Sequence, residues 1–164
     1  MRKIISVIVL AASLAGCATS QYGSFVKSSP AVFDQKMATD TVTQLVKLYP
    51  PATTRLELQQ ATPDTFGIAL VNNLRAQGYA VMEYKPVAAS ATAASATATA
   101  ADGKAAVQPA QSTLPGYPLR YVLDQFSGTN MYRVTVLVGS QSLTRAYTAQ
   151  NDTVLPAGAW VRKE

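Results

Sequence analysis

The sequence predicts an α+β fold, in which two helices pack against a small mixed or antiparallel sheet of about four to six strands. Two segments in the first half carry apolar residues at helical spacing, and three segments in the second half alternate apolar and polar residues. The 164 residues, 48% of them hydrophobic, suffice for one modest core with additional segments. We expect a leader at 1–16, a tether at 17–29 and a single α+β domain at 30–164, interrupted by a linker at 86–118.

The leader, residues 1–16, has the pattern of a secretory signal peptide. Arg2 and Lys3 supply the positive start, and an apolar run follows from Ile4 to Ala12. This run is too short to span a bilayer, which requires about 20 apolar residues. We therefore expect the leader to direct export and then to be removed.

The sequence Leu14-Ala15-Gly16-Cys17 follows the apolar run and resembles the lipobox of bacterial lipoproteins at every position. The resemblance implies a thioether-linked diacylglycerol on Cys17, cleavage before this residue, and acylation of the new amino group, with palmitate as the expected chain. Two or three acyl chains anchor a protein stably, whereas one binds only marginally. An ordinary signal peptide with a chance cysteine is the alternative. Ala18 follows the cysteine where inner-membrane retention signals have Asp, which favours lipid anchoring in the outer membrane, facing the periplasm.

The lipidated tether, residues 17–29, is polar and rich in small residues, with Tyr22 and Phe25 among them. Two interpretations stay open. The tether is either a disordered spacer or a short linear segment that docks on a partner and folds on binding. Under the second interpretation, Tyr22 and Phe25 are candidate partner-binding residues.

The first helix is expected between Ser29-Pro30, a capping residue followed by a first-turn proline, and Tyr49-Pro50-Pro51. A strand is expected next at 53–59, where Leu56 and Leu58 alternate with polar residues. The apolar stripe of this first helix contains Met37, Thr41, Leu45 and Leu48, widened by Val42 and Val46.

The second helix is expected from Thr62-Pro63-Asp64, with Thr62 as the N-cap, to a terminating Gly78. A strand is expected after it, at 79–85. The apolar stripe of this second helix contains Phe66, Ile68, Leu70, Val71 and Leu74.

The linker at 86–118 contains a stretch, residues 88–101, that is almost only Ala, Ser and Thr. It offers no apolar stripe to bury, so we expect a disordered insertion of low complexity. Three strands are expected after it, at 119–126, 131–138 and 141–149, joined by turn-forming residues.

Trp160 and Val161 near the end are expected to form a short closing strand. Aromatic side chains either fill a core or anchor an interface. Both interpretations stay open for the eight tyrosines and for Trp160, which is the third candidate partner-binding residue.

The composition leaves little room for catalysis. Histidine is absent and the single cysteine is assigned to lipidation, which removes the commonest general base and metal ligand. Two residue pairs remain as candidates for catalysis: a Ser–Lys dyad of Ser28 and Lys27, and an acid/base pair of Glu57 and Glu83. Solvated surface positions explain both pairs better. The net charge of +5 is spread along the chain, which disfavours direct nucleic acid binding. We expect no enzyme activity, no catalytic residue, no metal site and no cofactor.

Four features together resemble the TrbH family of conjugal transfer lipoproteins. They are the lipobox, the helix end at Tyr49-Pro50-Pro51, the segment Thr53 to Leu56, and the unit ending at Gln77 to Val81. The resemblance implies an outer-membrane structural component of the core complex of a conjugative type IV secretion system, which moves plasmid DNA during mating-pair formation. Its implied partners are the membrane and protein subunits of a core ring, within a large oligomeric complex.

The coarse fold also resembles the small N0-type modules of secretins, although fold alone does not fix function. One alternative is a pilotin-like or assembly-factor lipoprotein that binds a secretion-channel protein. A periplasmic enzyme and an exclusion protein at the cell surface are further alternatives.

Overall fold

The computed structural model describes residues 21–86 and 116–164, and these contain two helices and a mixed sheet of eight strands. The helices are α2 (Ala31–Leu48) and α3 (Thr65–Ala76), with a short 3-10 helix, η2 (Pro51–Thr53), between them. The strands are β1 (Gly23–Ser24), β2 (Arg55–Leu58), β3 (Ala80–Met82), β4 (Gly116–Gln125), β5 (Met131–Val138), β6 (Gln141–Gln150), β7 (Thr153–Pro156) and β8 (Val161–Lys163). The expected α+β class is confirmed.

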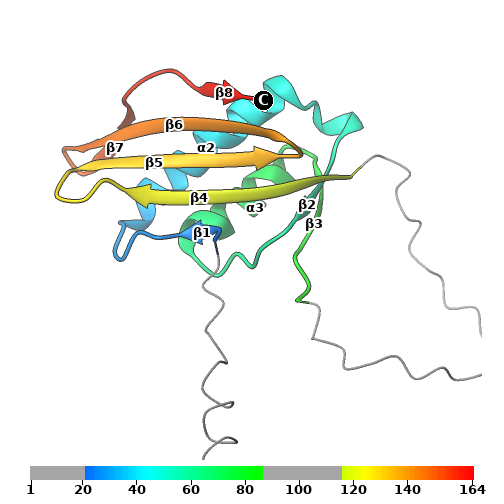
Figure 1. The fold of residues 1–164 in the computed structure, drawn as a ribbon, viewed down its shortest axis with the longest axis horizontal. Coiled ribbons are helices and arrows are strands. Elements are labelled where there is room, and N and C mark those ends of the chain that lie inside the picture. The colour runs from blue at the N-terminus through cyan, green and yellow to red at the C-terminus, as the bar shows by residue number, and fades with distance from the viewer. Residues whose placement is uncertain (1–20, 87–115) are drawn as a thin grey trace, which may run out of the picture.

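The sheet is built around the antiparallel meander β4–β5–β6 (Figure 1). On the free edge of β4, β2 pairs in parallel with its first residues and β1 pairs in parallel further along. On the free edge of β6, β8 pairs antiparallel with the first part of the strand and β7 pairs antiparallel with its last residues. Strand β3 extends the sheet beyond β2. The described sheet thus exceeds the expected four to six strands, because two-residue β1 and four-residue β7, which were not expected, are too short to show a clear alternating pattern.

Both helices lie on the same face of the sheet, and the core fills the space between (Figure 1). The alternation in β4 and β5 determines which residues reach this core, as expected from the sequence. The buried residues of these two strands are Leu119, Tyr121, Leu123, Tyr132, Val134, Val136 and Val138. No described helix covers the opposite face of the sheet.

The second helix starts differently from the expectation. Asp64, not Thr62, is the N-cap of α3, and its Oδ1 accepts a hydrogen bond from the Gly67 amide at 2.9 Å. Ile68, expected in the apolar stripe, is 50% exposed, because Gly67 and Val71 face the core instead. Gly78 ends the helix as expected, with a φ of +87°.

The first helix begins one residue later than expected, at Ala31, and Ser29 provides no capping hydrogen bond. Strand β3 is shorter than the expected 79–85, because its partner β2 offers only four residues for pairing.

The first strand after the linker begins earlier than expected. Strand β4 starts at Gly116, because its first residues pair with β2. Pro118 lies within β4 although it has no amide hydrogen to donate, and its carbonyl accepts a hydrogen bond from the Gly139 amide at 2.9 Å. The last residues of the expected linker therefore belong to the sheet, while residues 87–115 lie outside the described residues.

Candidate functional site

Arg145 connects three parts of the fold. It stands between Leu143 and Tyr147 on the face of β6 that is turned toward the helices. Its Nη1 donates to Asp40 Oδ2 on α2 at 2.8 Å, and its Nε donates to the carbonyl of Gly158 at 2.8 Å. The guanidinium also lies 5.9 Å from the centre of the Trp160 ring. One side chain therefore holds α2, β6 and the C-terminal loop together.

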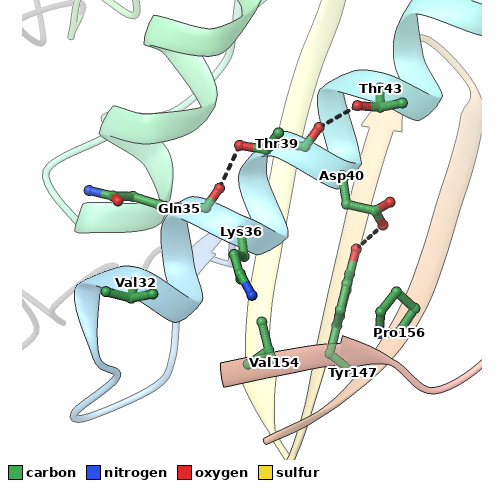
Figure 2. A pocket seen from close by; sticks show the side chains of 9 residues that line it. All are labelled: Val32, Gln35, Lys36, Thr39, Asp40, Thr43, Tyr147, Val154 and Pro156. Atoms are coloured by element: carbon green, nitrogen blue, oxygen red, sulfur yellow. Dashed lines mark hydrogen bonds between the residues drawn. The ribbon is translucent and has the colours of Figure 1, made fainter. Parts of the chain in front are cut away.

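Tyr147 completes this cluster. Its hydroxyl donates to the same Oδ2 of Asp40 at 2.7 Å (Figure 2). Burial raises the pKa of Tyr147, and the hydrogen bond to Asp40 raises it further, so the phenol stays protonated. Asp40 thus receives two donors and faces one cation, which makes it a structural counter-ion rather than an available base.

A groove of about 530 Å³ runs beside this cluster, between α2 and strands β6 and β7 (Figure 2). The Thr39 and Thr43 hydroxyls donate to helix carbonyls one turn earlier, and the Lys36 ammonium donates to the hydroxyl of Thr153. These polar groups are already engaged within the fold. The groove is lined by Val32, Gln35, Lys36, Thr39, Asp40, Thr43, Tyr147, Val154 and Pro156.

A second polar cluster fixes the start of α3 to the sheet. The Tyr121 hydroxyl donates to Asp64 Oδ2 at 2.5 Å. Gln60 donates to the carbonyl of Tyr121 at 3.2 Å and accepts from its amide at 3.1 Å. These bonds satisfy polar groups inside the core, where an unpaired one is costly.

Asp34 is a buried carboxylate on the first turn of α2, with 5% of its surface exposed. Burial raises the pKa of Asp34; Ser29 lowers it in part, and the nearby Asp64 carboxylate raises it by a lesser amount.

Two of the candidate partner-binding residues lie together. Tyr22 precedes β1, and its ring lies 5.3 Å from the guanidinium carbon of Arg120. Phe25 follows β1, donates its amide to the Leu123 carbonyl at 2.8 Å, and is 51% exposed. Residues 23–25 of the expected tether are therefore paired with the sheet and do not extend away from it.

Trp160 lies on the opposite edge of the sheet, in the loop before β8. Its ring packs partly buried against the core and beside Arg145. The three candidate residues consequently do not form one surface. Trp160 precedes the closing strand, which comprises Val161–Lys163.

The two residue pairs that the sequence raised and disfavoured as catalytic groups, Glu57 with Glu83 and Lys27 with Ser28, have other surroundings in the structure. Glu57 pairs with Arg55 at 2.6 Å, and Glu83 pairs with Arg75 at 2.5 Å, so each carboxylate has its own cation. Lys27 and Ser28 are exposed in the loop before α2. Among residues 21–86 and 116–164, no group of three or more His, Cys, Asp and Glu side chains could hold a metal ion.

Asp40, Arg145 and Tyr147 are the residues that sequence reasoning missed. A signal was present, since Arg145 occupies a core-facing position between two apolar ones in the expected strand 141–149. A cation at such a position requires a buried partner. Nothing in the sequence identified that partner as Asp40, which lies 105 residues away in the chain.

No helix within the described ranges is long and apolar enough to cross a membrane. Two family models match the chain. The model described as "Conjugal transfer protein TrbH" matches residues 19–164, and the model described as "Prokaryotic membrane lipoprotein lipid attachment site" matches residues 1–18. No curated protein and no solved structure gives a match.

Proposed function

Because the chain belongs to the TrbH family of conjugal transfer proteins and carries a lipoprotein attachment site, we propose that it is an outer-membrane lipoprotein and a structural component of a conjugative type IV secretion core complex. The family match over residues 19–164 carries this proposal, and it confirms the resemblance indicated by the sequence. Membership indicates a role in conjugation, and the attachment site indicates a lipid-anchored membrane protein.

Cys17 is the residue that we propose carries the lipid. It is the only cysteine in the chain, and it lies inside the matched attachment site. The residue after it is Ala18 rather than Asp, which supports placement in the outer membrane with the domain facing the periplasm.

The engaged polar groups described above support a role in assembly rather than catalysis. Asp40 serves Arg145 and Tyr147, and Glu57 and Glu83 each serve an arginine. Two helices on one face of a mixed sheet are also compatible with an N0-type module, which we include in the proposal.

Two edge strands supply surfaces for neighbouring subunits. Among the described strands, β3 pairs only with β2, and β8 pairs only with β6. Each carries an exposed apolar side chain, Met82 at 53% and Val161 at 65%. Open strand edges with exposed apolar residues are suited to pairing with a strand of another chain.

Isolation of the native assembly tests this proposal. The protein should be extracted from the outer membrane of conjugating cells in mild detergent and analysed by size-exclusion chromatography and mass spectrometry. We expect several copies in a large complex with other transfer-system subunits. A one-to-one complex with a single channel protein would instead indicate an assembly factor, and recovery as a free monomer would contradict both.

A further inference from the structure

We propose that the end of the sheet formed by β1 and the last residues of β4 lies on the bilayer that holds the lipid anchor, and binds anionic phospholipid there. This inference rests on the proposed lipidation of Cys17. The membrane-contact patch consists of Tyr22, Phe25, Lys27, Arg120, Phe126 and Arg133.

The chain between the anchor and the fold is short. Cys17 and Tyr22 are five residues apart, and five residues span at most about 18 Å even when fully extended. A domain of this size has a radius of gyration of about 13 Å. The pairing of Gly23–Ser24 with β4 therefore keeps the domain within roughly its own dimension of the lipid surface, with β1 nearest.

The phenylalanines divide into two buried in the core and two exposed beside β1. Of the four phenylalanines in the chain, Phe33 and Phe66 are buried in the core. Phe25 and Phe126 are 51% and 42% exposed. The Phe25 amide bonds to the Leu123 carbonyl, and Phe126 lies three residues further along the chain from Leu123, so both flank the point where the anchored segment enters the sheet. Aromatic side chains at such a position are suited to the bilayer interface.

The membrane-contact patch carries positive charge. Arg120 lies over the Tyr22 ring and Arg133 lies over the Phe126 ring, each at 5.3 Å from the ring centre. Arg133 is paired with Asp124, whose carboxylate cancels its charge. Arg120 and Lys27 form no ion pair among the described residues, so the patch keeps two uncompensated cations. Cations near the surface are attracted to anionic lipid headgroups.

Fluorescence quenching in vesicles tests this surface. The lipidated full-length protein is reconstituted in phosphatidylethanolamine vesicles that contain some phosphatidylglycerol, with brominated acyl chains as the quencher. The native Trp160 gives the baseline, and one tryptophan is added by Phe25→Trp or by Phe126→Trp. Ile68→Trp on α3 and Val161→Trp on β8 are matched controls, since both residues are at least as exposed as Phe126.

We expect bromolipid quenching of the added fluorescence in the Phe25→Trp and Phe126→Trp proteins to be several-fold stronger than in the two controls. Lys27→Glu should weaken this quenching, whereas Lys47→Glu, an exposed lysine at the far end of α2, should not. Equal quenching at all four positions would mean that the domain has no preferred orientation, and would overturn the proposal.

Two further outcomes separate the possible failures. A protein that floats with the vesicles but shows no quenching in the Phe25→Trp variant retains its anchor and lacks the membrane-contact patch. If that variant is shielded from aqueous iodide only in the assembled complex, a protein covers the patch and the proposal is wrong. A protein that does not float with vesicles lacks the anchor, which overturns both this inference and the proposed lipidation.

Discussion

The Arg145 guanidinium on β6 donates to the Asp40 carboxylate on α2 across 2.8 Å, and this pair attaches the long helix to the sheet. The side chains of Arg145 and Asp40 are 19% and 31% exposed, so water screens the pair only in part. By contrast, Arg133 and Asp124 form a pair whose arginine side chain is 44% exposed. The two pairs have the same chemistry and differ in the burial of the arginine, since the Asp124 side chain is 26% exposed and thus similar to that of Asp40.

We expect Arg145→Ala to lower the free energy of unfolding by about 2–3 kcal/mol, because it leaves the Asp40 carboxylate without its cation and removes charge-assisted hydrogen bonds. Arg133→Ala should cost less than about 1 kcal/mol, as for exposed ion pairs. Urea denaturation of both variants measures the difference. Equal losses would show that the cluster does not hold α2 in place.

Gly67 is a position where a methyl group has no room. A Cβ there would collide with the Tyr121 hydroxyl and lie 2.9 Å from the Thr62 Cβ. We expect Gly67→Ala to be destabilising, because overpacking costs about 1–3 kcal/mol and displacing the hydroxyl also breaks its bond to Asp64. This loss outweighs the helix-propensity gain of about 1 kcal/mol.

Asn72→Ala, at an exposed position on the same helix, is the control, and it should leave the melting temperature unchanged or raise it slightly. Thermal unfolding followed by circular dichroism compares the two variants. A stabilised Gly67→Ala protein would mean that Tyr121 can move aside without penalty.

The sequence predicted most of the core, because the buried positions follow regular spacing. Leu56 and Leu58 in β2, and the alternating residues of β5, are buried where the pattern indicated. The predictions of secondary structure failed where pairing between distant segments overrides the local pattern of apolar and polar residues. Strand β1 exists because β4 offers an open edge, and two residues cannot display a period of two.

The Arg145 cluster could be predicted only in part, for a similar reason. The alternation in 141–149 is a signal that Arg145 faces the core, but its partner Asp40 lies on a helix whose rotation about its axis is set by packing against the sheet. The shortened tether likewise depends on long-range pairing, which changes the expected role of Phe25 from a free aromatic to one fixed beside β4.

Asp34 should make stability depend on pH. Burial raises the pKa of this carboxyl above its ordinary value of 3.8, so the folded protein binds its proton more tightly than the unfolded chain does. The stability associated with the protonated form is fully present below the unfolded pKa and is lost as the pH rises through the folded one. We therefore expect Asp34→Asn to raise the melting temperature at neutral pH.

The gain from Asp34→Asn should shrink as the pH falls toward 3.8, because the wild-type carboxyl then becomes neutral in both states. Melting curves of wild type and variant across this range give the difference directly. A gain that is independent of pH would show that ionisation of Asp34 is not its cause.

The open strand edges should be needed for assembly but not for folding. We expect Met82→Lys on β3 and Val161→Lys on β8 to reduce incorporation into the large complex, because a lysine on an edge strand opposes pairing with another strand. Ile68→Lys, at a similarly exposed position on α3, should assemble normally.

Co-purification with the other transfer-system subunits, at matched expression, measures the effect of these edge variants. Normal incorporation of both edge variants would place the subunit contacts on another surface.

Plasmid transfer by a strain that lacks this gene, complemented by the wild-type chain or by Cys17→Ser, measures whether the anchored protein is needed for conjugation. We expect deletion to abolish or strongly reduce transfer, the wild-type chain to restore it, and Cys17→Ser to accumulate as a soluble periplasmic protein without restoring it. Unchanged transfer in the deletion strain would contradict a role in the conjugation apparatus. Full restoration by the unanchored Cys17→Ser protein would contradict the requirement for a lipid anchor.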